Sequence, residues 1–165
     1  MTSYADYLLA KHRRRVALVD SNLLLLLFVG QFRRDLISKF KKLNTFTPED
    51  YDILAVALNE FSVIATTPNI LTEVSNLSGM LSSQIRPIYY DSFAHGLTLL
   101  DEKYVPSREV ALTPAFRAFG ISDAGIALIA KEGMLVLTDD LMLYQYLSAN
   151  GVDTLNFNHI RSWSA

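Results

Sequence analysis

Short apolar runs that alternate with longer helical patterns are the feature that most constrains the fold of this chain. Val16–Val19, Ser62–Thr66 and Met134–Thr138 are runs of this kind. Their length and their β-branched residues predict buried strands rather than helices. Strands that alternate with helices favour a parallel sheet that is covered on both faces. We therefore expect an α/β fold with three layers, α/β/α, around a central parallel sheet of roughly five strands.

Capping residues mark where several of the expected helices begin. Thr47-Pro48 and Thr67-Pro68 each place a capping side chain before a proline at the first helical position. These signals predict helices that continue to about Phe61 and to Gly79. The segment Ser21–Phe32 is almost wholly apolar, which predicts a buried helix.

The remaining segments have weaker patterns. Residues from Ile85 to Tyr104 are mostly helical in pattern, and Glu109–Thr113 is compatible with a short strand. Ser122 is expected to cap a helix that continues to Ala130. A helix from Asp140 to about Ala149 and a last strand over Val152–Phe157 complete the prediction.

Length and composition limit the class of protein. The chain has 165 residues, which predicts one domain over 1–165 with a core of about 14–160 and a short N-terminal extension. Cysteine is absent, which excludes disulfide scaffolds, zinc-cysteine sites and thiol catalysis. The longest apolar run, Leu23–Val29, is far shorter than the roughly 20 residues that span a bilayer. We expect a cytoplasmic protein that is not inserted in a membrane.

Positive charge is concentrated in two parts of a chain whose net charge is −2. Local basic patches can hold phosphates even when the whole protein is not basic. Solubilising surface charge explains the same residues equally well. The candidate RNA-binding residues in these patches are Arg13, Arg14, Arg15, Arg33 and Arg34.

Acidic residues follow the ends of expected strands or lie in the helices beside them. Because ligands of parallel sheets bind at the carboxyl ends of the strands, these acids can reach one common edge. Carboxylates are hard oxygen ligands that suit Mg²⁺ or Mn²⁺, and a metal held there can activate water near a phosphodiester. Taken singly, each acid is better explained by helix capping, by the helix dipole or by a solvated helix face than by a metal site. The acids are Asp20, Glu73, Asp123, Asp139 and Asp140.

The order and spacing of these acids resemble the PIN-domain family over nearly the whole chain. The family has an apolar strand that ends in Asp with Asn, Ser or Thr two residues later, then a helix with one Glu. An Asp-Ala helix start and a strand that ends in Thr-x-Asp follow. The stretches that match are Val16–Leu24, Thr67–Val74, Gly120–Ile126 and Leu135–Asp140.

The resemblance implies a PIN-like fold and a metal-dependent endoribonuclease that uses Mg²⁺ or Mn²⁺. It implies that Asp20, Asp123 and Asp140 bind the metal and that Glu73 binds metal or orients water. The catalytic acids implied are thus Asp20, Glu73, Asp123 and Asp140. Asn22 and Thr138 would support them through hydrogen bonds, and Asp139 would replace or assist Asp140.

Partners are also implied by the resemblance. Many small PIN proteins are VapC-type toxins, which an antitoxin silences by placing its C-terminal tail in the acidic pocket, and homodimers are common among them. RNA would be the substrate. One departure from the family concerns the segment between Thr113 and Asp123, which is short for the helix expected there.

Other classes of protein remain open at this point. A PIN-like module that binds RNA or protein without cutting would share the same fold. A haloacid-dehalogenase-like phosphatase would need an aspartate at Asn22, and a response-regulator receiver would need a lysine at the end of a late strand. Both of these phosphotransfer folds fit the sequence less well.

Overall fold

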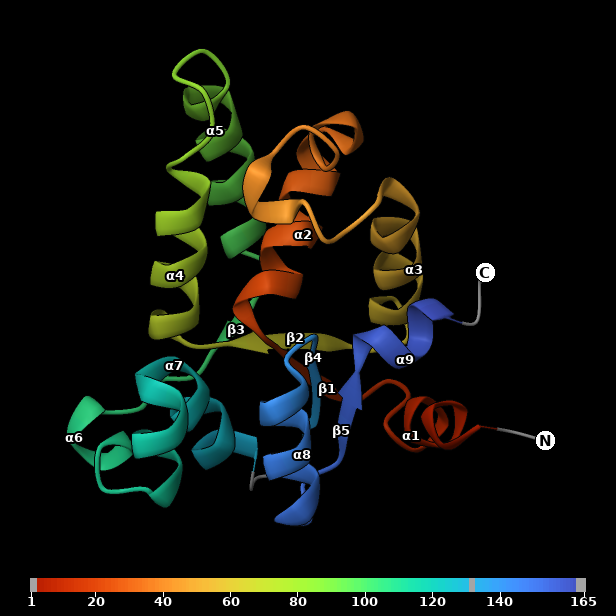
Figure 1. The fold of residues 1–165 in the computed structure, drawn as a ribbon, viewed down its shortest axis with the longest axis vertical. Coiled ribbons are helices and arrows are strands. Elements are labelled where there is room, and N and C mark those ends of the chain that lie inside the picture. The colour runs from red at the N-terminus through yellow and green to blue at the C-terminus, as the bar shows by residue number, and fades with distance from the viewer. Residues whose placement is uncertain (1–2, 131–132, 163–165) are drawn as a thin grey trace.

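The computed structural model describes residues 3–130 and 133–162, in which helices cover one parallel sheet (Figure 1). The strands are β1 Val16–Val19, β2 Val63–Thr66, β3 Asp101–Glu102, β4 Leu135–Thr138 and β5 Thr154–Asn156. The α-helices are α1 Tyr4–Lys11, α2 Ser21–Phe32, α3 Pro48–Leu58, α4 Pro68–Ser78, α5 Arg86–Leu97, α6 Ser107–Val110, α7 Pro114–Ala130, α8 Leu141–Ala149 and α9 Phe157–Arg161. Short 3₁₀ helices follow α2, and they are η1 Arg34–Leu36 and η2 Lys41–Leu43.

The sheet has five strands in the order β3-β2-β1-β4-β5, and every pair is parallel. Strand β1 lies at the centre, where Leu18 is opposite Ala65 of β2 and Val19 is opposite Leu137 of β4. The residues that follow these strands therefore emerge at the same edge of the sheet. The predicted α/β fold with a five-stranded parallel sheet is confirmed.

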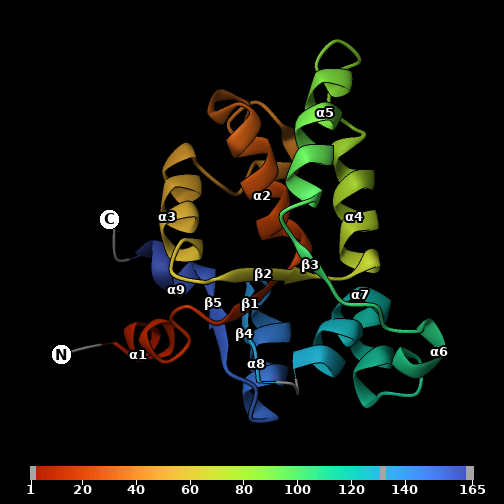
Figure 2. The ribbon, with the colours of Figure 1, turned by 180° about the vertical axis from the view of Figure 1, so that it is seen from behind.

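Helices lie on both sides of the sheet, as the front and back views show (Figures 1 and 2). The group α2, α3, α4 and α5 lies on one side, and α6, α7 and α8 lie on the other. This arrangement is the three-layer α/β/α architecture expected for a buried parallel sheet. Among the described residues, no helix combines the length and the apolar character needed to cross a bilayer.

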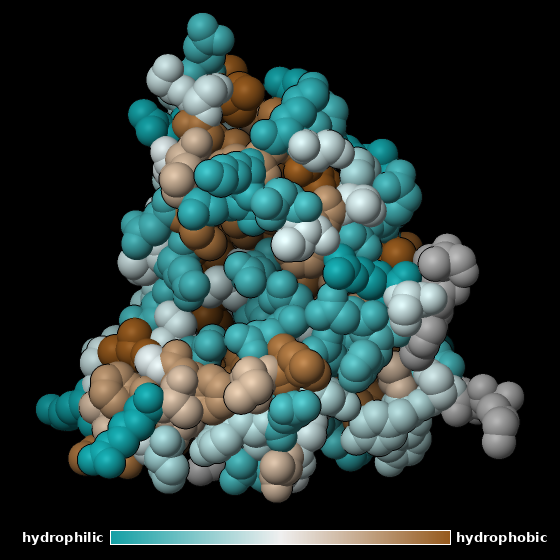
Figure 3. Space-filling model, in the orientation of Figure 1, coloured by the Kyte–Doolittle hydropathy of each residue, from teal (hydrophilic) through white to brown (hydrophobic). Residues whose placement is uncertain are grey.

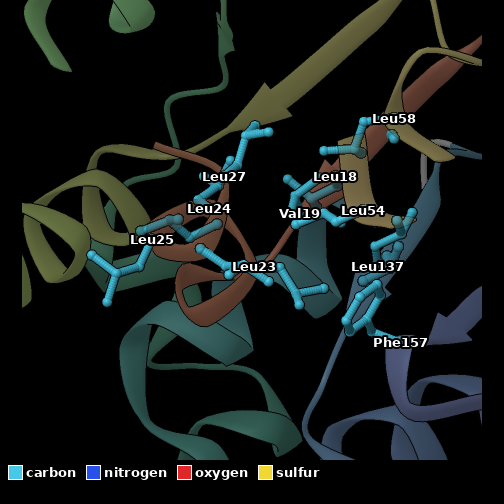
Figure 4. Close-up of a cluster of buried hydrophobic side chains, with 14 of the residues drawn as sticks. Leu18, Val19, Leu23, Leu24, Leu25, Leu27, Leu54, Leu58, Leu137 and Phe157 are labelled. Atoms are coloured by element: carbon cyan, nitrogen blue, oxygen red, sulfur yellow. The ribbon is translucent and has the colours of Figure 1, made fainter. Parts of the chain in front are cut away.

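Helix α2 lies at the centre of its layer and explains the long apolar run in the sequence. Leu23, Leu24, Leu25 and Leu26 are all fully buried, and the helix contacts α3, α4 and α5. Figure 4 shows leucines of α2 beside side chains from the strands and from α3. A helix that is apolar on every side is stable only when it is enclosed in this way. Its burial fixes the position of its first residue, which follows Asp20.

The predicted helix starts at the Thr-Pro pairs are confirmed. Thr47 Oγ1 accepts a hydrogen bond from the Asp50 amide at 3.2 Å, and Asp50 Oδ2 accepts one from the Thr47 amide at 2.8 Å. Thr67 Oγ1 accepts a hydrogen bond from the Ile70 amide at 3.2 Å. Helix α4 then ends before Gly79, as predicted, whereas α3 ends at Leu58, three residues before Phe61.

The strand expected over Glu109–Thr113 is wrong, because this region holds the short helix α6. Only Val110 is buried there, so the segment lacks the apolar face that a strand would pack. The missing strand is β3, inside the region that was expected to be mostly helical. Its residues Asp101 and Glu102 pair with Ala65 and Thr66 of β2.

Two further boundaries differ from the prediction. Strand β5 ends at Asn156, whose side chain accepts a hydrogen bond from the Asn158 amide at 2.9 Å and so starts α9. Ser122 does not cap a helix, because it lies inside α7 and the break in that helix is at Gly120. The segment between Thr113 and Asp123, which is short for the helix expected there, is itself helical and forms the first part of α7.

The N-terminal extension folds as α1 and is attached to the residues before β5. His12 Nε2 lies 2.6 Å from Asp153 Oδ2, and Lys11 Nζ lies 2.6 Å from the same oxygen. His12 is 2% exposed, whereas the side chains of Asp153 and Lys11 are 25% and 42% exposed. The extension is therefore packed against the body of the fold.

Candidate functional site

The predicted acids meet at the carboxyl edge of the sheet, around one cavity of about 120 Å³. They come from the start of α2, from α4, from α7 and from the connection between β4 and α8. Segments that are far apart in sequence are thus brought to one place by the sheet order. The residues that line the cavity are Asp20, Ser21, Asn22, Glu73, Asp123, Asp139 and Asp140.

Asp20 is held in one orientation by hydrogen bonds to both of its carboxylate oxygens. Oδ1 accepts from the Leu23 amide at 3.1 Å, and Oδ2 accepts from the Asp139 amide at 3.1 Å and from the Thr138 hydroxyl. The strand register explains the last contact, because Val19 is opposite Leu137 and the next residues are therefore neighbours. Asp20 is only 5% exposed, so it is a rigid and nearly buried wall of the cavity.

The two acids after β4 have different partners. The Asn22 amide donates to Asp139 Oδ1 at 3.2 Å, so its partner is Asp139 and not Asp20, the acid it was expected to support. Asp140 Oδ1 accepts from the amides of Met142 and Leu143 at 2.7 and 3.0 Å, so it caps α8. The Asp140 amide donates to Thr138 Oγ1 at 3.0 Å. Thr138 therefore connects Asp20 to the loop that carries both acids.

Asn158 also holds this loop, and the sequence did not indicate it. Its side-chain amide donates to the backbone carbonyl of Asp139 at 3.0 Å. Asn158 is in α9, whose existence was not predicted. The C-terminal helix thus helps to fix the acid-bearing loop.

Glu73 and Asp123 face the cavity from the helices on either side. Glu73 Oε2 accepts a hydrogen bond from the Ser21 hydroxyl at 2.9 Å. Asp123 accepts no hydrogen bond from the described residues, and it lies in the first turn after the break at Gly120. Ser21 was not among the predicted site residues, although its place between Asp20 and Asn22 puts it at the same helix start.

Burial and mutual repulsion raise the pKa of several of these carboxyls. Burial is the main cause at Asp20, with the charge of Asp139 second, and the pKa reaches about 8 against hydrogen bonds that lower it. Burial followed by the charges of Glu73, Asp140 and Asp139 raises the pKa of Asp123 to about 6. Burial also raises the pKa of Asp139. A bound cation is the simplest way to keep such carboxylates ionised.

The donor set suits a hard cation, but the side chains are not arranged around one. Carboxylate and amide oxygens are the ligands that Mg²⁺ and Mn²⁺ prefer. As they stand, no three His, Asp or Glu side chains in residues 3–130 and 133–162 could hold a metal ion together. Glu73 and Asp139 are instead hydrogen-bonded to Ser21 and Asn22. Each of these carboxylates keeps lone pairs that a cation could bind.

The candidate RNA-binding arginines are not brought to this cavity. Arg13, Arg14 and Arg15 precede β1 and so lie at the opposite edge of the sheet from Asp20. Arg33 and Arg34 follow α2, about 18 Å along the helix from its start. No lysine or arginine lines the acidic cavity within the described part of the chain.

Most of these arginines already have acidic partners on the surface. Arg13 pairs with Glu60 at 2.8 Å, and Arg33 pairs with Asp35 at 2.8 Å. Arg34 pairs with Asp52 at 2.7 Å and with Glu49 at 3.4 Å. Their role in RNA binding stays a prediction, separate from the acidic cavity.

Comparison with known proteins does not identify a family or a relative for this chain. Neither a protein-family model nor a curated protein matches the chain. The resemblance to the PIN-domain family therefore rests on the sequence motifs alone.

Proposed function

We propose that this protein is a PIN-type, metal-dependent endoribonuclease whose active site is the acidic cavity. The observation that carries the proposal is the convergence of Asp20, Glu73 and Asp123 with the acids after β4 at one sheet edge. Burial and like charges raise the pKa of Asp20 and Asp123, so the ionised forms of these carboxyls favour a bound cation.

Each residue has a task in this proposal. Mg²⁺ or Mn²⁺, when bound by Asp20, Asp123 and Asp140, supplies a Lewis acid beside the scissile phosphodiester. Glu73 lies in the same cavity and orients the attacking water. The water oxygen forms a bond to phosphorus while the bond from phosphorus to O3′ breaks, and O3′ takes up a proton. The products are a 5′-phosphate and a 3′-hydroxyl.

Thr138 and Asn22 act through the acids rather than on the substrate. Thr138 holds Asp20 and the amide of Asp140, and Asn22 holds Asp139. Such supporting contacts typically change metal affinity or activity by about 10–100-fold. The toxin role, the antitoxin partner, the homodimer and the cytoplasmic location remain parts of the proposal that rest on the family resemblance.

A catalytically silent PIN-like module that binds RNA or protein is the second candidate. The observation that favours it is that Glu73, Asp139 and Asp140 already make hydrogen bonds within the protein. On this reading the cavity would be a structural polar cluster.

Cleavage of a mixed RNA pool with Mn²⁺ or Mg²⁺ separates the two candidates. Asp20→Asn and Asp123→Asn keep side-chain size but remove a charge, and each is expected to lower cleavage by at least about 100-fold. Asp91→Asn is the matched control, because Asp91 is exposed on α5 and lines no part of the cavity. EDTA should abolish cleavage by the wild type.

Other outcomes would decide against the proposal. Cleavage that survives both substitutions would come from a contaminant or from another site. A wild type that cuts nothing with either metal would favour the binding module.

A further inference from the structure

A second groove continues from the acidic cavity along α4. It has a volume of about 330 Å³ and lies between α4 and the part of α7 that follows Gly120. Glu73 lines both the groove and the acidic cavity, so the two spaces adjoin. The groove residues used below are Asn69, Thr72, Asn76, Leu77, Ile121 and Ser122.

The wall formed by α4 is one face of an amphipathic helix. Positions 69, 72, 73 and 76 are separated by the spacings that place residues on one helix face. The opposite face carries Ile70 and Val74, which are both fully buried. Since the buried face fixes the rotation of α4 against the core, the polar face is held towards the groove.

Three polar side chains of the groove are free to bind a ligand. The side chains of Asn69, Asn76 and Ser122 make no hydrogen bond to any other described residue, whereas Thr72 Oγ1 donates to the Pro68 carbonyl at 2.8 Å. An asparagine amide both donates and accepts, so it can match a group that presents a donor beside an acceptor. Leu77 and Ile121 add apolar surface.

The charge of the groove restricts the ligand further. No lysine or arginine of the described residues lines it, and Glu73 is its one charged wall. A phosphate would find no cationic side chain there. A nucleobase fits better, because its edge carries paired donors and acceptors and its faces are apolar.

We infer that this groove binds the base of a nucleotide next to the scissile phosphodiester, and that Asn69 and Asn76 select which base is accepted. The inference rests on the proposed function for the neighbouring cavity. The ligand class is single-stranded RNA, because a base must leave its stack to enter a groove of this kind.

Sequencing the cut ends of a randomised pool of short single-stranded RNAs tests the inference. The wild type should prefer one base at a position beside the cut. Asn69→Ala or Asn76→Ala should reduce this preference by about tenfold, the scale of one paired contact to a base.

Asn59→Ala is the matched control, because Asn59 directly follows the last residue of α3 and lines neither space. Alanine favours helix more than asparagine does, so Asn76→Ala should fold, and a thermal melt checks this. An unchanged base preference in both groove variants would overturn the inference. A preference that Asn59→Ala also loses would do the same.

A binding experiment keeps the inference testable if the proposed function fails. Should the wild type cut no RNA, the same pool is incubated with Asp20→Asn protein and the bound RNAs are sequenced. A base preference that Asn76→Ala weakens about tenfold would support the groove without cleavage. The inference would be overturned if the bound RNAs were the same with and without the Asn76→Ala substitution. That result would be expected if the groove received a peptide instead of a base.

Discussion

Thr138 and Thr66 end the strands on either side of β1, and both are fully buried. The Thr138 hydroxyl donates to Asp20 and accepts from the Asp140 amide. The Thr66 hydroxyl has no hydrogen-bond partner among the described residues. Thr138 and Thr66 therefore occupy similar positions, but only Thr138 makes hydrogen bonds to residues of the cavity.

Replacing each threonine by valine should distinguish the hydrogen-bonded hydroxyl of Thr138 from the hydroxyl of Thr66. Thr138→Val should lower RNA cleavage by about 10–100-fold and the free energy of unfolding by about 1–3 kcal/mol, because Asp20 loses a buried partner. Thr66→Val should leave cleavage unchanged and raise the free energy of unfolding by up to about 1 kcal/mol, since no hydrogen bond is lost. Urea denaturation and a cleavage assay measure both. Equal losses in the two variants would contradict this account.

The acids that follow strands were the most predictable residues of the site. Asp20 ends an apolar run, and it lies beside Thr138 because β1 and β4 pair in parallel. Ser21 was not predictable in the same way, because its partner Glu73 is 52 positions away. Its hydroxyl gains a role only when α4 packs beside α2. Asn158 was missed for the same reason, since α9 brings it to Asp139.

Among the elements, α7 depends on a backbone conformation that glycine alone adopts readily. Gly120 has φ 76° and ψ −172°, inside an element that is otherwise helical. A residue with a side chain is strained in this region by about 1–3 kcal/mol. The break sets where the second part of α7 begins, and this part carries Ser122 and Asp123. The backbone at Gly120 therefore positions residues of both the cavity and the groove.

Gly120→Ala should lower the free energy of unfolding by about 1–3 kcal/mol and should also reduce RNA cleavage, because Asp123 follows the break. Gly125→Ala is a control in the same helix. Gly125 has an ordinary helical backbone, and an added Cβ would lie 4.0 Å from Val110 Cγ2, an ordinary contact. That variant should be neutral or gain up to about 1 kcal/mol. Equal costs at both positions, measured by urea denaturation, would show that backbone strain is not the cause.

At this scale the sequence predicted elements with a strong local pattern and missed those that depend on partners. Val16–Val19 and the Thr-Pro helix starts carry their own signals. Strand β3 has only Asp101 and Glu102, and pairing with β2 alone makes it a strand. Apolar residues up to Phe157 suggested a longer last strand, yet Asn156 caps a helix there.

For the whole molecule, the raised pKa values link folding to pH. In the unfolded chain an aspartate ionises near 3.8, whereas Asp123 in the fold stays protonated up to about 6 and Asp20 up to about 8. The folded state thus binds more protons between these values, and the free energy of unfolding falls as pH rises from about 4 to about 8. Asp35 and Asp52 have lowered pKa values, so they are ionised throughout this window.

Divalent cations should reverse this loss where the carboxyls are ionised. Mg²⁺ or Mn²⁺ at about 100 times its dissociation constant adds about 2.7 kcal/mol to the free energy of unfolding, provided that it binds only the folded protein. We expect a rise in Tm of several degrees at pH 8 and a much smaller one at pH 5, where protons occupy the ligand oxygens.

Thermal melts of the wild type and Asp20→Asn at both pH values measure this. The Tm of Asp20→Asn should depend less on pH without metal and should change little when metal is added. Subtracting the two pH profiles of Tm cancels the contribution of groups that titrate in the same way in both proteins. A metal-induced rise that is equal at both pH values, or equal in Asp20→Asn, would place the cation outside the acidic cavity.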